Sequence, residues 1–151
     1  MPDLRPRSVS VILCSADAEA LDELVAPGHG ARTLRTAPDE TLAIARSDSA
    51  DVVARELEDR IAALDTDAVV VDVTDGWSAW ALSGADAARA FSYLSALDPP
   101  EPGAFVQGDV ARVGAIVLGE DDGLTILVPA YWGEHIRERA VADARATEPS
   151  A

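Results

Sequence analysis

The sequence predicts an α+β fold, with helices packed on one face of an antiparallel sheet and ferredoxin-like split βαβ elements. Two observations support this prediction. Short apolar runs rich in β-branched residues alternate with longer segments whose apolar residues recur at helical spacing. The order strand, strand, helix occurs three times, over residues 31–64, 69–97 and 109–146, after an initial strand and helix. The three units differ in length and share no motif, so a solenoid repeat is not indicated.

The first half of the chain is expected to contain three strands and two helices. Val9, Val11 and Leu13 recur at every second position, as they do in a strand. Ser15 is a suitable N-cap for the helix that follows. The expected elements are a strand over 8–14, a helix over 16–25, strands over 31–37 and 40–46, and a helix over 48–64.

The middle of the chain has the clearest succession of elements. The apolar, β-branched run 69–73 predicts a buried strand, and residues 77–82 predict a second strand that is apolar on both faces. Ser83 is the expected N-cap of the next helix, with Asp86 three residues later completing a capping box. We expect this helix to end at residues 98–100, because its last residue is followed by two prolines.

The last third predicts a β-hairpin and a helix. Residues 109–118 and 124–128 are the expected strands, joined by a five-residue loop with glycine at each end, and a helix follows over 131–146. Taken together, the chain is expected to have a flexible arm over 1–7, a single α+β domain over 8–146 and a disordered tail over 147–151.

Composition excludes several classes of function. The formal net charge of −15 argues against binding nucleic acid or an anionic membrane. The chain has no lysine, which excludes Schiff-base chemistry and a Walker-type phosphate lysine. The N-terminal residues lack the apolar segment of a signal peptide, and no apolar run approaches the length of a transmembrane helix. A cytoplasmic location is therefore the default expectation.

Few side chains point to catalysis or metal binding. The single Cys14 lies in an apolar strand and is expected to be a small buried hydrophobe. His29 lies in a Pro-Gly-His-Gly turn, and we expect it to be a solvated loop residue. His135 and Glu138 are neighbours at i, i+3 on a helix, which supplies only part of a metal site, since such sites use three or four ligands. We expect no catalytic residue and no metal site.

The aromatic side chains are the candidate binding residues. Trp77, Trp80, Tyr131 and Trp132 make up four of the seven aromatic residues. Tryptophan and tyrosine are favoured where one end of a side chain is apolar and the other is wet, as at protein interfaces. They also fill cores, so both roles remain open for each of the four.

Several short motifs follow one another in the middle of the chain. They are Pro-Asp-Glu-x-Leu at 38–42, Asp-hydrophobic-Thr-Asp at 72–75, Leu-Ser-Gly-x-x-Ala at 82–87, Leu97-Asp98, and then Phe105 and Gly108. In this order they resemble the folate-binding, glycine-cleavage T-protein superfamily, and within it the gamma subunit of heterotetrameric sarcosine oxidase. The resemblance covers roughly residues 36–145 and implies the same α+β fold.

The resemblance does not extend to the residues used for aminomethyl transfer. In the T-protein, a glycine-rich hairpin is followed by paired aspartates, and an Asn-Ala pair follows the next strand. Here the hairpin 113–119 has carboxylates only at its loop tip, and Val128-Pro129-Ala130 stands where Asn-Ala would be. Transfer chemistry by this chain alone is therefore not expected.

The resemblance favours a non-catalytic small subunit that docks on a larger folate- or flavin-bearing oxidase or demethylase. We expect no cofactor on this chain alone, with folate possible at the partner. A stand-alone small enzyme or ligand-binding protein in a biosynthetic pathway is one alternative. A self-associating, homodimeric regulatory domain that senses a metabolite is another.

Overall fold

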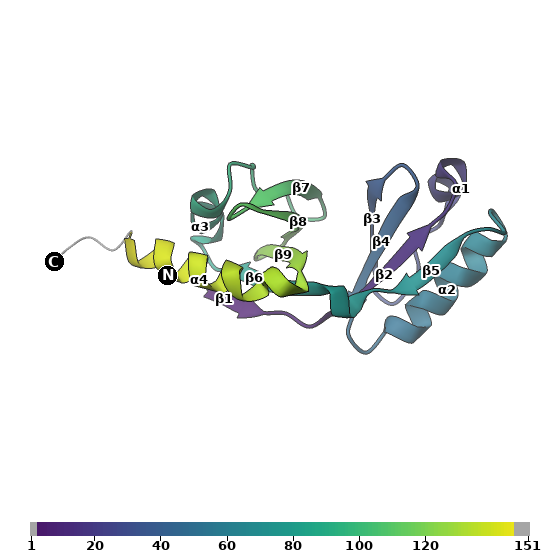
Figure 1. Cartoon of the computed structure of the whole chain (residues 1–151), viewed down its shortest axis with the longest axis horizontal. Helices are drawn as coiled ribbons and strands as arrows, with labels where there is room; N and C mark the ends of the chain where they lie inside the picture. The colour runs from purple at the N-terminus through teal and green to yellow at the C-terminus, as the bar shows by residue number, and fades with distance from the viewer. Residues whose placement is uncertain (1–2, 147–151) are drawn as a thin grey trace. The chain divides into compact units, whose positions relative to one another are not determined.

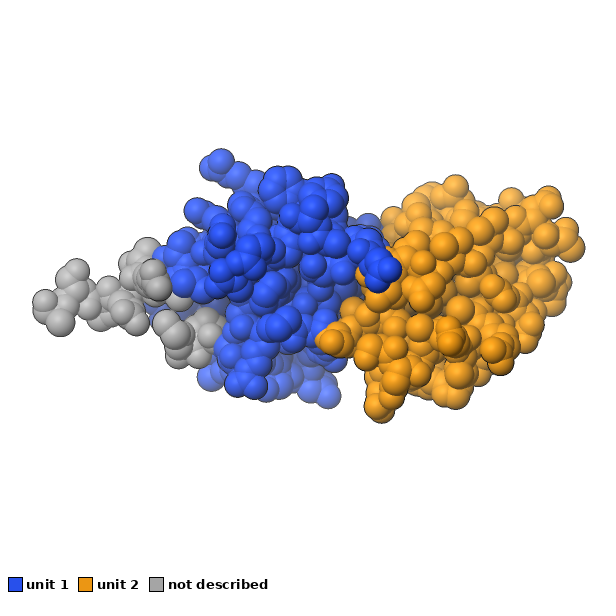
Figure 2. Space-filling view, turned by 60° about the horizontal axis from the view of Figure 1, so that its bottom comes forward, with its two compact units in different colours: residues 1–7, 75–151 blue, residues 8–74 orange. Residues whose placement is uncertain are grey.

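The structure, a computed structural model, describes residues 3–146. The chain divides into two compact units, shown in different colours in Figure 2. One unit contains the N-terminal residues up to 7 and the residues from 75 on, and the other contains residues 8–74. The sequence predicted a single domain over 8–146. Each unit has its own sheet and its own apolar clusters, and the chain leaves the first unit and later returns to it. The domain organisation stays a prediction.

The first unit is a five-stranded antiparallel sheet with the strand order β1-β6-β9-β8-β7 (Figure 1). Its strands are β1 (Asp3–Pro6), β6 (Trp77–Ser83), β7 (Phe105–Val110), β8 (Val113–Glu120) and β9 (Gly123–Pro129). Its helices are α3 (Ala87–Leu94), the 3₁₀ turn η2 (Ala130–Trp132) and α4 (Gly133–Ala146), and the 3₁₀ turn η1 (Thr74–Gly76) leads into β6.

One face of this sheet and the two longer helices enclose an apolar core. Every second residue of β8 and β9 contributes to it, which is the strand period of two. Phe91 and Leu94 of α3 and Ile136 of α4 pack on these sheet residues and complete the core. The sheet members of the core are Leu82, Val110, Val113, Ala115, Val117, Leu124, Ile126 and Val128.

The second unit is a four-stranded antiparallel sheet with the order β3-β4-β2-β5. Its elements are β2 (Val9–Ser15), α1 (Ala18–Glu23), β3 (Arg32–Ala37), β4 (Glu40–Arg46), α2 (Ala50–Ala62) and β5 (Val69–Asp72). Val53 and Leu57 of α2 pack on Ile12 and Ala43 of the sheet, and Ile61 packs with Leu21 of α1 and Cys14 of β2. The α+β class and the antiparallel pairing are confirmed, with the strands divided between two sheets.

Two strands at sheet edges differ from their predictions. Residues 3–6, expected in a loose arm, form β1 and pair with β6. An edge strand tolerates Pro6 because its outer N–H positions have no partner to lose. The run 69–73 was expected to be buried. It forms β5 at an edge, where Val69 and Val71 are exposed and only Val70 reaches the cores. The expected tail over 147–151 lies outside the described residues.

The predicted capping box before α3 is wrong. Ser83 is the last residue of β6 and still pairs with Gly123 of β9. Gly84 then turns the chain with a φ of 97°, and α3 begins at Ala87 with Asp86 as an N-cap that makes no side-chain capping bond. The helix ends at Leu94 and not at residue 98, because Ser95 is already extended.

The predicted strand over 109–118 is two strands. Ala111 and Arg112 form a two-residue turn between β7 and β8, with φ values of 50° and 67°. Positive φ at both central residues is the geometry of a type I′ hairpin turn, which usually contains asparagine or glycine. The next hairpin, between β8 and β9, is confirmed, but its loop is the two residues Asp121 and Asp122 and not the expected five, because Gly119, Glu120 and Gly123 belong to the paired strands.

Candidate functional site

The short turn η2 carries Tyr131, the most exposed aromatic side chain among the described residues, and next to it Trp132. Tyr131 is 80% exposed and Trp132 is 40% exposed. Their ring centroids lie 5.6 Å apart, and the Trp132 ring also meets His135 of α4 edge-on at 5.4 Å. The pair therefore forms a continuous apolar surface at the start of α4. We call Tyr131 and Trp132 the aromatic pair.

Contacts with Ser78 of β6 hold η2 close to that strand. The Ser78 hydroxyl donates a hydrogen bond of 3.3 Å to the Ala130 carbonyl. A Cβ on Gly133 would lie 2.5 Å from the Ser78 hydroxyl oxygen, so glycine is the residue that allows this approach. Because η2 is fixed between β9 and α4, the aromatic pair is presented in a defined position.

The other two candidate residues lie differently. Trp80 packs against the apolar core of its unit, and its indole N–H is buried without a hydrogen-bond partner among the described residues. Trp77 is half-buried and pairs with Pro129, next to η2. The structure thus brings Tyr131 and Trp132 together on the surface, whereas Trp80 is partly buried against the core.

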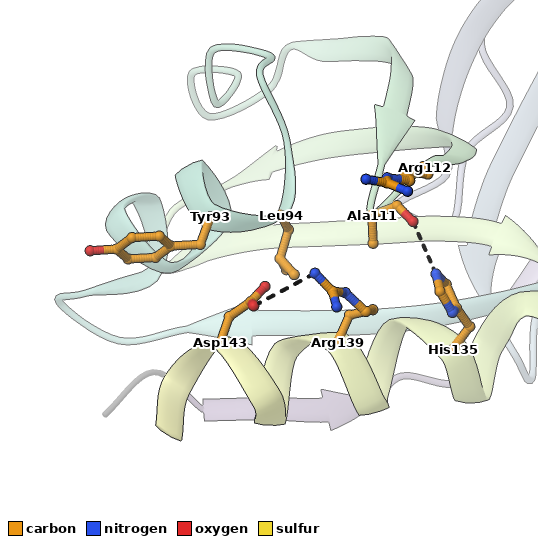
Figure 3. Close-up of a pocket in the computed structure, with 7 residues that line it drawn as sticks. All are labelled: Tyr93, Leu94, Ala111, Arg112, His135, Arg139 and Asp143. Atoms are coloured by element: carbon orange, nitrogen blue, oxygen red, sulfur yellow. Dashed lines mark hydrogen bonds and ion pairs between the residues drawn. The ribbon is translucent and has the colours of Figure 1, made fainter. Parts of the chain in front are cut away.

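A cavity of about 320 Å³ lies beside α4 in the same unit (Figure 3). It is formed where α3, the turn between β7 and β8, and α4 meet. None of the four candidate aromatic residues lines it, although His135, which contacts Trp132, does. Its lining residues are Tyr93, Leu94, Ala111, Arg112, His135, Arg139 and Asp143.

Two hydrogen bonds hold the turn that forms one wall of the cavity. His135 Nε2 lies 2.9 Å from the Ala111 carbonyl oxygen, and the Ala111 N–H donates a bond of 2.6 Å to the Leu94 carbonyl. The sequence indicated only that His135 neighbours Glu138 on a helix. It is half-buried and links α4 to the turn. Sequence reasoning missed the cavity because its residues come from three separate segments.

The remaining titratable candidates have structural roles. His29 is paired with Glu56 of α2 at 3.1 Å, and the Gly28 N–H donates to the same carboxylate. That backbone hydrogen bond, together with His29 and Arg60, lowers the pKa of Glu56. Burial, with a smaller contribution from Asp65, raises the pKa of the Cys14 thiol, as expected for an unreactive buried cysteine.

Between residues 3 and 146, histidine, cysteine and acidic side chains do not gather in any group of three that could hold a metal ion. In the same range, no helix has both the length and the apolar character needed to cross a membrane.

The antiparallel sheets and the helices form an α+β fold that is also found in a chain of an oxidase and in an aminomethyltransferase. A chain of heterotetrameric sarcosine oxidase from Corynebacterium sp. U-96 superposes with a TM-score of 0.80 at 16% identity. The match covers 99% of this chain and 87% of that one. The glycine cleavage system aminomethyltransferase T from Bartonella henselae matches with a TM-score of 0.70 and 16% identity, over 94% of this chain and 46% of the enzyme.

A further likeness links the fold to regulatory domains. The regulatory subunit of aspartate kinase from Thermus thermophilus, in its ligand-free form, matches with a TM-score of 0.55 and 10% identity, over 97% of this chain and 98% of that chain. No protein-family model and no curated protein matches the sequence. The resemblance to the sarcosine oxidase gamma subunit and the T-protein superfamily is confirmed at the level of the fold.

Proposed function

We propose that this chain is a non-catalytic small subunit that docks on a larger folate- or flavin-bearing oxidase or demethylase. The observation that supports this most strongly is the match across 99% of this chain and 87% of a heterotetrameric sarcosine oxidase chain. The match extends over most of both chains, which supports an equivalence between this chain and that oxidase chain.

The aromatic pair is the proposed contact with the larger subunit. Tyr131 and Trp132 are exposed, adjacent and fixed on η2. Tyrosine and tryptophan are enriched among the interface residues that contribute most to binding. In this proposal Trp77, half-buried beside η2, lies at the rim of the contact, and Trp80, partly buried against the core, lies behind it.

The cofactors belong, in this proposal, to the partner. This chain covers less than half of the aminomethyltransferase that it matches. At the end of β9, where the T-protein has Asn-Ala, this chain has Pro129 and then η2. The proposed division of labour is therefore that the larger subunit binds folate or flavin and carries out the chemistry.

The test is co-purification of the tagged chain with its partner from the native host. Replacing Tyr131 and Trp132 with alanine is expected to weaken assembly by about 2 kcal/mol or more, as truncation of interface anchors does, without changing thermal stability. Val25→Ala is a matched control, because Val25 is 69% exposed and lies in the other unit. If the aromatic variants unfold at lower temperature and still assemble, the aromatic pair is part of the core and the proposed contact is wrong.

A homodimeric, metabolite-sensing regulatory domain is the second candidate. The observation in its favour is the match to an aspartate kinase regulatory subunit over nearly the full length of both chains. Light scattering separates the two candidates. A docking subunit is expected to remain a monomer when purified alone, and a regulatory domain of this kind is expected to be a dimer.

A further inference from the structure

We infer that the cavity beside α4 binds a small organic carboxylate with an apolar body. This inference concerns a different surface from the aromatic pair and does not depend on the docking proposal. It rests on the charges, the backbone geometry and the apolar wall of one cavity.

Two arginines line the cavity in a strongly acidic chain (Figure 3). Arg112 enters from the turn between β7 and β8, and Arg139 enters from α4. Within residues 3–146, Arg112 is exposed and makes no hydrogen bond or ion pair. A guanidinium presents several N–H donors in a planar fork that matches a carboxylate. Arg112 therefore has its donors available to a ligand.

Arg139 is held only loosely by its neighbour. Its guanidinium nitrogen lies 3.8 Å from a carboxylate oxygen of Asp143, which also lines the cavity. This separation exceeds hydrogen-bond length, so the N–H donors of Arg139 are not used up by Asp143. By contrast, the guanidinium of Arg35 is engaged by the Asp22 carboxylate at 2.9 Å and by backbone carbonyls.

The backbone that carries Arg112 is strained and fixed. Ala111 and Arg112 both have positive φ, which residues with a Cβ adopt at a steric cost. Glycine or asparagine would form this turn more easily. The turn is held from both sides, by Leu94 of α3 and His135 of α4. Strained backbone of this kind, held by its surroundings, is found at ligand sites.

The size and remaining wall of the cavity indicate the kind of anion. Leu94, Ala111 and the half-exposed Tyr93 provide apolar surface next to the arginines. The volume of about 320 Å³ is at the lower end of the range for small-molecule pockets. The cavity therefore fits an acid with a compact aromatic or branched aliphatic body, and inorganic phosphate would leave the apolar wall uncovered.

Titration of the full-length chain with benzoate, followed by backbone amide NMR shifts, tests the inference. Benzoate is expected to give saturable shifts in the turn at 111–112, at the end of α3 and in α4. Benzamide has the same shape without the charge, and acetate and inorganic phosphate carry charge without the apolar body. All three are expected to bind at least about tenfold more weakly, since charged hydrogen bonds and buried apolar groups each contribute on this scale.

Matched variants separate binding from folding. Arg112→Gly relieves the positive φ and is expected to keep or raise the melting temperature while weakening benzoate binding at least about tenfold. His29→Gly relieves a positive φ of 62° in the other unit and is expected to keep benzoate binding. Arg139→Gln is expected to weaken binding as Arg112→Gly does. Arg55→Gln, an exposed arginine of α2 in the other unit, is expected to leave it unchanged.

The inference is overturned if benzoate gives no saturable shifts in the cavity. It is also overturned if phosphate or benzamide binds there as tightly as benzoate, because the ligand class would then be wrong. Equal weakening by Arg55→Gln and Arg139→Gln would show that only the overall charge matters, and this result contradicts a built site.

Discussion

A close backbone approach at Gly119 leads to a sharp prediction about the first unit. Gly119, in β8, lies against the connector that follows the helix α3. A Cβ added there would lie 2.0 Å from the Glu101 carbonyl oxygen and 2.7 Å from that of Pro100. Since real Cβ atoms do not approach closer than 3.0 Å, the connector would have to retreat by at least 1 Å, from 2.0 to 3.0 Å.

The cost of Gly119→Ala follows from two effects. Overpacking that forces backbone to move costs about 1–3 kcal/mol. The movement also strains two backbone hydrogen bonds, from the Gly119 N–H to the Ala104 carbonyl at 2.9 Å and from the Gly103 N–H to the Gly119 carbonyl at 3.2 Å. Each bond contributes about 1 kcal/mol. Gly119→Ala is therefore expected to lower the free energy of unfolding by about 2–4 kcal/mol.

Gly114 supplies the control within the same strand. A Cβ on Gly114 meets no atom within 4 Å, and its side is exposed. Gly114→Ala is expected to be neutral or to stabilise the fold by up to about 1 kcal/mol. All three tryptophans lie in the first unit, so urea unfolding followed by tryptophan fluorescence reports on this unit. Equal effects of the two substitutions would refute the packing of the connector on β8.

Two further predictions concern local backbone and charge. Ser83→Ala is expected to change the free energy of unfolding by less than about 0.5 kcal/mol, because Ser83 caps no helix. Gly84→Val is expected to cost roughly 1–2 kcal/mol or more, because Gly84 has a φ of 97°. A large effect of Ser83→Ala in a thermal melt would restore the capping interpretation. Folding lowers the pKa of Glu56 below its ordinary value of 4.5. The ionised carboxylate therefore stabilises the folded state above pH 4.5, and this stabilisation is lost as the pH falls through the lowered pKa. Glu56→Gln is therefore expected to make the melting temperature, measured by circular dichroism, fall less steeply as the pH is lowered. An unchanged dependence of the melting temperature on acidic pH would contradict the pairing of Glu56 with Gly28 and His29.

Much of the fold was predictable because it depends on local patterns. The strands β2, β3, β4 and β6 and the helix α2 have strong periodicity, and their bounds fall within two residues of expectation. The boundary between β7 and β8 was missed for a physical reason. Its turn uses Ala111 and Arg112, which carry none of the glycine or asparagine signal of a type I′ turn.

Pairing between distant segments was not predictable from local sequence. Residues 3–6 contain a proline and two charged side chains, which suggest a loose arm, and only their partner β6 makes them a strand. The run 69–73 is β-branched and apolar enough for a core strand, yet its position at a sheet edge exposes it. Edge position is decided by the order of strands, which no short window contains.

The candidate site was partly predictable for the same reason. Tyr131 and Trp132 stood out as adjacent aromatics at the start of the helix predicted over 131–146, and they are exposed on η2, ahead of α4. The sequence left open whether Trp80 fills a core or an interface, because its packing against the core depends on α4 and Gly133, which are distant in the sequence. The two arginines of the cavity are 27 residues apart (139 minus 112), and nothing in their sequence context indicates that they meet.

The most direct test of the docking proposal is the composition and absorption spectrum of the complex purified through this chain. We expect the chain expressed alone to be colourless. When it is purified from its native host, we expect it to bring a larger polypeptide in fixed ratio together with a flavin absorption band. Flavin or stoichiometric metal on the isolated chain, or recovery from the host of this polypeptide only, would contradict a small subunit that leaves the chemistry to its partner.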